Sequence, residues 1–441
     1  MNKGTPFSLK IACVSLFLLL VGNGVFAEAD VWSSGASWKG IKNHTSVSYN
    51  GKIYSFGGVN NYSIPSNAVE IYDIATNSWS TGTAGGTARS DHSSVVYNGK
   101  VYSWGGLEGG NKLDIYDIAT NSWSTGVAGG TGRALFSSVV YNGKIYSWGG
   151  LNNTNFNRLN TLDIYDIATN SWSTGVSGGT ARVAHSSVVH NGKIYSWGGG
   201  AGDALIPVNT IDIYDIATNS WSTGTAGGSA RQQHTSVLHN GKMYSFGGGM
   251  GQGGTIPVNV VDIYDTVTNS WSSGVVGGSF RTDHSSAIHN GKIYLWGGVD
   301  VSAPFAFPFV LLNTLDIYQI ATVSPIVSIE GVKSIVSNMS LSSNVANKLN
   351  HNLDIAIKKL GDSKTKDNGK FVCNELSLFK KDIKNALKKD ISQIQADSLI
   401  DATQIIQTEF GCVEKVASSQ SFFGVIWSAI RPLFVFLSII G

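Results

Sequence analysis

The stretch that decides the fold is Arg89–Trp123, which reads RSDHSSVVYNGKVYSWGGLEGGNKLDIYDIATNSW. Close copies of it fill most of residues 28–324, and every copy contains a doubled glycine. The glycine pairs lie about 50 residues apart, a period at which one unit cannot bury its own apolar face and must stack on its neighbours. The pairs are Gly57-Gly58, Gly105-Gly106, Gly149-Gly150, Gly198-Gly199, Gly247-Gly248 and Gly297-Gly298.

Each copy predicts four short antiparallel strands. The first, His92–Tyr97, alternates polar and apolar residues. Asn98-Gly99 follows it, the favoured pair for a two-residue type I′ hairpin, because both turn positions need a positive φ. The other strands are expected at Lys100–Trp104, Leu113–Ile118 and Ser122–Thr125. Four such strands repeated six times are typical of a β-propeller, whose closed ring removes exposed sheet edges.

The copies resemble the kelch-repeat family. Its marks are the doubled glycine after an aromatic residue, the Tyr-Asp of IYDIATNSW and the tryptophan six residues beyond that aspartate. The resemblance implies a mainly β fold, a six-bladed kelch-type β-propeller over residues 28–324. The sixth copy lacks the Asn-Ser-Trp segment, and the sequence from Asp30 to Gly35 supplies a substitute. We therefore expect Trp32–Gly35 to pair with Leu315–Ile320 and close the ring.

The N-terminus has the pattern of an export signal over residues 1–27. Lys3 and Lys10 precede or flank an apolar core, Ile11–Val21, and Ala27-Glu28-Ala29 offers a cleavage site after either alanine. We therefore expect an exported protein, located outside the cell or in the cell envelope.

After Pro325 the apolar spacing becomes helical. We expect a linker over 325–340, a three-helix module over 341–414 and a hydrophobic tail over 415–441. The module resembles one found near the C-termini of bacterial exported proteins, and that resemblance implies a disulfide between Cys373 and Cys412. Two free buried thiols are the alternative. The tail is long enough for a membrane span, but Arg431-Pro432 interrupts it, so membrane association and packing on the helices both stay open.

Repeated polar residues precede each first strand, with an arginine three positions before a histidine in most copies. Strand direction places them at the same end as the loops after the glycines, which vary in length and chemistry. Arginine suits carboxylate or phosphate ligands because its planar fork donates two parallel hydrogen bonds. The alternative is structural: the arginine bonds loop carbonyls, and the histidine is a satisfied residue at a strand end. Ile41 and Phe136 interrupt the pattern. The candidate ligand-binding residues are Arg89, Arg182, Arg231, Arg281, His185, His234, His284, Phe305, Phe307 and Phe309.

Two functions follow from this arrangement. The favoured one is an exported binding protein that recognises a protein or glycan at the cell surface through the variable loops. The alternative is a sugar-modifying enzyme resembling the kelch-type sialic-acid mutarotases, for which Asp91 and Asp283 are the only carboxylates in the repeated frame near the arginines and histidines. A buried carboxylate with a strongly perturbed pKa would favour the enzyme, and an exposed Phe305–Phe309 loop would favour binding.

Several classes of function are excluded or unsupported. The net charge of +2 and the lack of a basic face argue against nucleic acid as a partner. Residues 28–324 contain no cysteine, which excludes a kelch-type copper oxidase resembling galactose oxidase. We predict no cofactor, no metal site and no assigned catalytic residue, because no His-x-His or Cys/His spacing supports metal binding.

Overall fold

The computed structural model describes residues 30–254, 256–300, 310–321, 329, 332–333, 336, 343–361, 368–386, 400 and 403. They belong to two compact units, of which one is Asp30–Ile320 and the other contains the helical residues that follow it. The expected signal sequence, Phe305, Phe307, Phe309, Cys412 and the hydrophobic tail lie outside the described residues.

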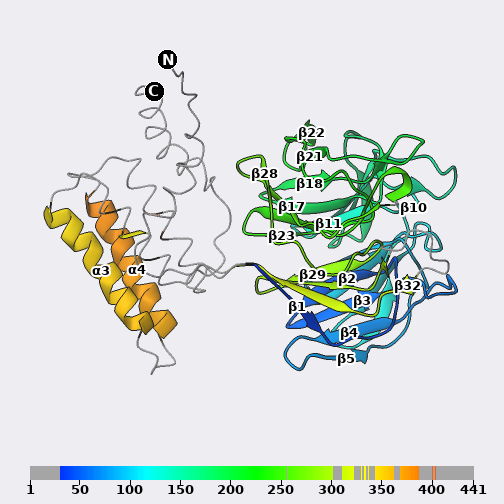
Figure 1. The fold of residues 1–441 in the computed structure, drawn as a ribbon. Helices are drawn as coiled ribbons and strands as arrows, with labels where there is room; N and C mark the ends of the chain where they lie inside the picture. The colour runs from blue at the N-terminus through cyan, green and yellow to red at the C-terminus, as the bar shows by residue number, and fades with distance from the viewer. Residues whose placement is uncertain are drawn as a thin grey trace, which may run out of the picture. The chain divides into compact units, whose positions relative to one another are not determined.

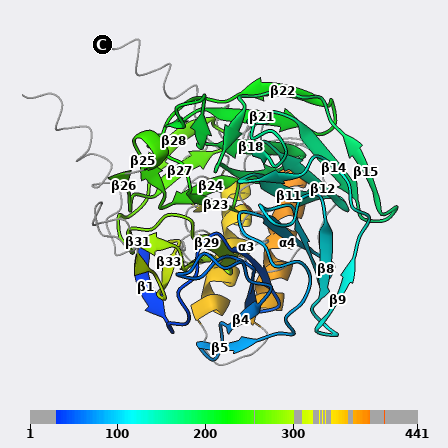
Figure 2. The ribbon, with the colours of Figure 1, turned by 90° about the vertical axis from the view of Figure 1, so that its right-hand side faces the viewer.

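The unit Asp30–Ile320 contains six four-stranded antiparallel sheets, each of which is one blade of a propeller (Figure 1). Figure 2 shows these sheets arranged around a centre in chain order. The first strand of every blade contacts the first strands of both neighbouring blades, so these six strands surround the central channel. They are β2 (Thr45–Tyr49), β6 (Ser93–Tyr97), β11 (Ser137–Tyr141), β17 (Ser186–His190), β23 (Thr235–His239) and β29 (Ser285–His289).

An Asn-Gly turn joins each first strand to the second. Asn98 and Gly99 have φ values of 48° and 73°, as the predicted type I′ hairpin requires. The second strands are β3 (Lys52–Phe56), β7 (Lys100–Trp104), β12 (Lys144–Trp148), β18 (Lys193–Trp197), β24 (Lys242–Phe246) and β30 (Lys292–Trp296).

The third strands complete the inner part of each blade, and the fourth form its outer edge. The third strands are β4 (Val69–Asp73), β8 (Leu113–Asp117), β14 (Leu162–Asp166), β21 (Ile211–Asp215), β27 (Asp262–Asp265) and β33 (Leu315–Gln319). The fourth strands are β5 (Ser78–Thr81), β9 (Ser122–Thr125), β15 (Ser171–Thr174), β22 (Ser220–Thr223), β28 (Ser270–Ser273) and β1 (Val31–Gly35).

The N-terminal strand closes the ring, as predicted. β1 pairs with β33 in antiparallel register, with Trp32 opposite Tyr318. In the first blade the Tyr72 hydroxyl donates to Asn77 at 2.8 Å, whereas in the sixth blade the Tyr318 hydroxyl donates to Asp30. Asp30 therefore occupies the place of the asparagine that the sixth copy lacks.

Aromatic residues and glycines fill the space between blades. Trp123 contacts Phe56 of the preceding blade edge-on at 5.9 Å, so this tryptophan packs between two blades. A Cβ atom on Gly149 would lie 2.7 Å from Cε1 of His185 in the next blade, and φ is +67° there. The first glycine of each pair is thus required both for its backbone conformation and for close approach of the next blade.

The loops after the doubled glycines pair with the segments that precede the first strands. Arg133–Ala134 pairs with Leu151–Asn152, and single bridges join Lys42 to Val59 and Thr282 to Val299. The variable loops and these segments therefore share one end of the propeller, as predicted. The short elements here are β10 (Arg133–Ala134), β13 (Leu151–Asn152), β16 (Arg182–Val183), β19 (Gly200–Ala201), β20 (Ile206–Pro207), β25 (Gly249–Met250), the 3-10 helix η1 (Gln252–Gly254), β26 (Ile256–Pro257), β31 (Val299–Asp300) and β32 (Val310–Leu311).

The helical unit contains α3 (Ser343–Gly361) and α4 (Asn368–Ala386), which pack against each other. Ile329, Val332 and Val336 are helical and buried in the same core, so this part of the expected linker 325–340 belongs to the folded unit. Of the expected third helix, Ile400 and Thr403 are described, and both are helical. None of the described helices is long and apolar enough to cross a membrane. Cys373 lies on α4, and its pairing with Cys412 stays a prediction.

Candidate functional site

A belt of hydroxyl groups encircles the central channel at the loop end. Each first strand begins with two serine or threonine residues. Ser186 bonds Ser236 of the next blade at 2.6 Å, and Ser236 bonds Ser245 within its own blade at 2.7 Å. Equivalent bonds across the blade junctions join Thr45 to Ser94, Ser137 to Ser187 and Ser285 to Ser46. The belt therefore ties neighbouring blades together.

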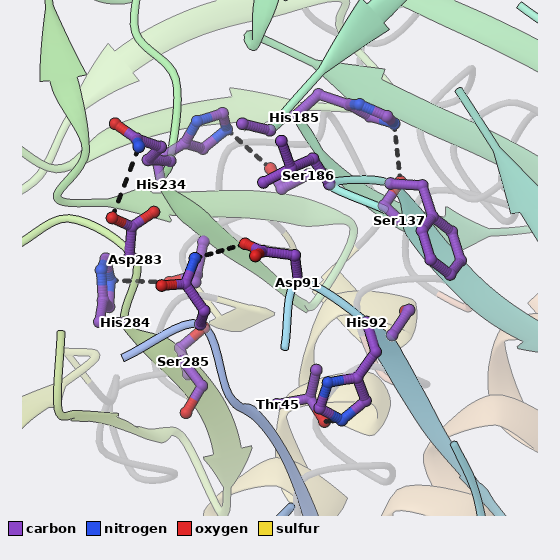
Figure 3. Close-up of a pocket in the computed structure, with 18 of the residues that line it drawn as sticks. Thr45, Asp91, His92, Ser137, His185, Ser186, His234, Asp283, His284 and Ser285 are labelled. Carbon is purple, nitrogen blue, oxygen red and sulfur yellow. Dashed lines mark hydrogen bonds between the residues drawn. The ribbon is translucent and has the colours of Figure 1, made fainter. Parts of the chain in front are cut away.

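Histidines reinforce the same junctions. Nε2 of His185 lies 2.9 Å from Ser137, and Nε2 of His234 lies 2.8 Å from Ser186 (Figure 3). Burial, and after it the nearby arginine charges, lowers the pKa of both histidines well below its usual value. The same two causes lower the pKa of His44 to about 3, so these rings are neutral at pH 7.

Phe136 replaces one of these histidines. It contacts Trp104 edge-on at 4.8 Å, as His185 contacts Trp148 at 4.8 Å. Its ring preserves the packing but offers no hydrogen bond. Ser93, on the preceding blade, therefore has no imidazole to bond at the place where Ser137 bonds His185. The belt is open at this junction.

The arginines of the repeated pattern form a buried ring, which we call the arginine ring. Arg133 directs all five of its donors at oxygen atoms: Thr131 and Gly149 carbonyls, the carbonyl and hydroxyl of Thr161, and the carboxylate of Asp163. Its exposed fraction is 0%. The ion pairs of the ring are Arg89–Asp114, Arg133–Asp163, Arg182–Asp212, Arg231–Asp262 and Arg281–Asp316.

This geometry corrects the ligand-binding hypothesis for four of these arginines. These four guanidinium groups are buried and bond carbonyls and a carboxylate of their own blade, although Nε of Arg281 has no partner among the described residues, and no arginine lines the cavity at the channel mouth. The structural alternative describes these side chains, which are Arg89, Arg182, Arg231 and Arg281. In the first blade, Ile41 replaces the arginine, and Trp38 and Lys39 bond Glu70 at 2.6 and 3.1 Å instead.

A second ring lies at the mouth of the channel, formed by the residue that precedes each histidine or Phe136. Each backbone N–H donates to the carbonyl of the same position in a neighbouring blade, over 2.7 to 3.2 Å, and the six bonds close a circle. Every φ in the circle lies between 54° and 60°. We call this the mouth ring, and in blade order it contains Asn43, Asp91, Leu135, Ala184, Gln233 and Asp283.

The mouth ring and the hydroxyl belt line a cavity of about 220 Å³ that is open to solvent (Figure 3). His185, His234 and His284 line it, so the candidate histidines do meet at one place. Their imidazoles serve the blade junctions, however, and the side chains that distinguish one blade from the next belong to the mouth ring. Sequence reasoning singled out Asp91 and Asp283 but missed the other four positions. The signal was present: the residue before the histidine differs in almost every copy.

Two carboxyl groups with raised pKa values face this cavity. Burial, followed by repulsion from Asp283, raises the pKa of Asp91 to about 7. Burial raises the pKa of Asp283 to about 6, although the charge of Lys42 acts in the opposite direction. Asn43 donates a hydrogen bond to Asp91, and Gln233 donates one to Asp283 at 3.4 Å.

Metal binding finds no support here: the described residues include no cluster of three or more histidine, cysteine or acidic side chains able to hold a metal ion. The expectation of no metal site stays a prediction.

Comparison with protein families agrees with the fold. Residues 135–322 match the model of the KLHDC2/KLHL20/DRC7 Kelch-repeats domain, and residues 41–84 match the Kelch motif. No curated protein matches the chain. The chain therefore carries Kelch repeats, which fold as a kelch-type β-propeller followed by a small helical unit.

Proposed function

We propose that this chain is an exported binding protein that recognises a protein partner through the variable loops at the mouth-ring end of the propeller. We call this surface the loop face. The observation that carries the proposal is that each of the six variable loops exposes a large apolar side chain. These side chains are Tyr62, Ile64, Leu107, Phe156, Ile206, Ile256 and Val310.

Single exposed apolar residues are ordinary, but their recurrence in every loop at one end of a repeat protein is typical of an interaction surface. Tyr62 is 82% exposed and Phe156 is 65% exposed. Phe156 also has a φ of 57°, a conformation that is unfavourable for a bulky residue. Backbone strain at a loop tip is typical of functional positions, because stability alone would remove it.

The test is affinity capture with the full chain. A variant with Tyr62→Ser, Phe156→Ser and Ile206→Ser removes apolar surface from three loops. The matched control, Val31→Ser and Val267→Ser, removes exposed apolar side chains from the outer strand β1 and from the turn between β27 and β28, which lies beside an Asn-Gly turn at the other end of the blade. We expect partner proteins, quantified by mass spectrometry, to be lost with the first variant and kept with the second. Equal capture by both variants would contradict the proposal.

A glycan could occupy the same surface, and a glycan array probed with the same proteins separates the two classes of ligand. Binding to glycans without any captured protein would reassign the loop face to carbohydrate. The proposed export is tested separately by fractionating cells that express the full chain, with residues 2–27 deleted as the control.

The second candidate is a sugar-modifying enzyme, and one observation favours it. Asp91, with a pKa of about 7 beside a cavity, has the properties of a general acid or base. An assay of sugar mutarotation with wild-type protein and Asp91→Asn tests this candidate. If wild-type protein accelerates mutarotation and Asp91→Asn does not, the result would support the enzyme. If the wild-type rate equals the uncatalysed rate, the result would contradict this candidate function.

A further inference from the structure

The cavity at the channel mouth has two chemically distinct sides. Along the mouth ring, Gln233, Asp283, Asn43 and Asp91 follow one another on consecutive blades and form a polar arc. Leu135 and Ala184 complete the circle as an apolar arc, and Phe136 extends it into the cavity. The wall is therefore acidic on one side and apolar on the other.

The charges that face the cavity have one sign. The arginines do not line it and are neutralised by the third-strand carboxylates, and the lining histidines are neutral. Asp91 and Asp283 are the acidic residues of the lining. Glu108 adds negative charge near Asp91, and Lys42 offsets part of the charge of Asp283. No lysine or arginine among the lining residues compensates the negative charge of Asp91 and Asp283.

We propose that this cavity receives one organic cation with an apolar stem, the ammonium or guanidinium group of a lysine or arginine side chain of the bound protein. The proposal rests on the proposed protein-binding function and names the chemistry that the centre of the loop face recognises. A cation between Asp91 and Asp283 relieves their mutual repulsion. The methylene stem of the same side chain contacts Leu135 and Phe136, as lysine and arginine stems commonly contact apolar surface.

The size and the ligand set favour a side chain over a bare metal ion. A cavity of about 220 Å³ is many times larger than the space of about 10–15 Å³ that one water molecule requires, so it is ample for one side chain. The described residues offer no group of three or more metal-binding side chains. An apolar arc would also contribute nothing to a metal ion.

The cavity's acidity makes its occupancy depend on pH. Both carboxyl groups take up protons between about pH 7 and pH 6, because their pKa values are raised to about 7 and about 6. A cation binds the ionised pair, so its affinity falls as pH drops through this range. Lys42 and Glu108 are the other charged groups near the pair.

The experiment measures binding of small probes to the full chain by ligand-observed NMR, without any partner protein. The probes are the N-acetyl amides of arginine, lysine and norleucine, together with glucose. We expect the two cationic probes to bind, and to bind about tenfold or more weakly at pH 5 than at pH 8. The double variant Asp91→Asn/Asp283→Asn should bind the two cationic probes no more tightly than it binds the norleucine probe. Asparagine suits these positions because it tolerates a positive φ.

The matched control is Asp203→Asn, which removes a fully exposed carboxylate from a variable loop. It should leave cationic binding within about twofold of the wild type, as for a solvent-screened charge. Equal binding of norleucine, preferential binding of glucose, no binding of the cationic probes, or binding independent of pH would each overturn the proposal. Since no probe touches a partner, these outcomes are independent of the capture experiment that tests the loop face.

Discussion

The arginine ring and the mouth ring are two positions apart in each repeat and differ in almost every property. The arginines recur in five copies, are buried, and use their side chains to hold the blade together. The mouth ring varies from copy to copy, and its backbone, rather than its side chains, closes the circle. Where the backbone alone does the structural work, the side chain is free to serve recognition.

Deleting residues 30–36 should have the largest effect, because it opens the ring that supports both sets of residues. The deletion removes β1, the pairing of Trp32 with Tyr318 and the hydrogen bond to Asp30. We expect a sharp fall in melting temperature, measured by circular dichroism. Val31→Ser is the control, since Val31 is exposed on the same strand. An unchanged melting temperature after the deletion would show that closure contributes nothing.

Lowering the pH from 7 to 5 should destabilise the propeller next most strongly. In the folded state the pKa values of the five histidines at the blade junctions lie below 6.5. The unfolded chain therefore binds protons in this pH range that the folded chain does not bind. Stability is therefore fully present above about pH 6.5 and is lost below it, by up to about 1.4 kcal/mol per pH unit for each histidine. The raised pKa values of Asp91 and Asp283 act in the opposite direction, because the folded chain binds these protons more tightly than the unfolded chain. Two carboxyl groups offset only part of the effect of five histidines. Urea unfolding at several pH values measures the slope.

His185→Phe sharpens that prediction, because Phe136 already occupies the equivalent place in the preceding blade. The variant should reduce the slope of stability against pH by about one proton. An unaltered slope would mean that the buried histidines do not cause the acid sensitivity.

The third-largest loss of stability is expected when one buried ion pair is broken. Arg182→Ala leaves the carboxylate of Asp212 buried without its partner, so we expect a loss of about 3–5 kcal/mol in the free energy of unfolding. Gln233→Ala, in the mouth ring, removes one long hydrogen bond to Asp283 and should lower the free energy of unfolding by only about 1 kcal/mol. Urea unfolding at pH 7.5 measures both free energies of unfolding. Similar losses for the two substitutions would contradict the different roles that we assign to the two rings.

Much of the fold could be predicted from the sequence because turn chemistry is local. Asn98-Gly99 specified the hairpin, and the missing Asn-Ser-Trp of the last copy specified closure by Trp32. The role of Arg89 was not local. Its partner Gly105 follows β7 and its partner Asp114 lies on β8, so only the fold shows that they accept its hydrogen bonds. The mouth ring was missed for the same reason, because five of its bonds join residues about 50 positions apart and the sixth joins Asn43 to Asp283.

The most direct test of the central claim is the free energy of unfolding of Asp91→Asn at pH 8. The folded state raises the pKa of Asp91 from 3.8 to about 7, so its ionised form costs stability above that range. Removing the charge should therefore leave stability unchanged or increase it, as expected for a residue kept for recognition. A loss comparable to that of Arg182→Ala would show that Asp91 holds the scaffold and would contradict the account.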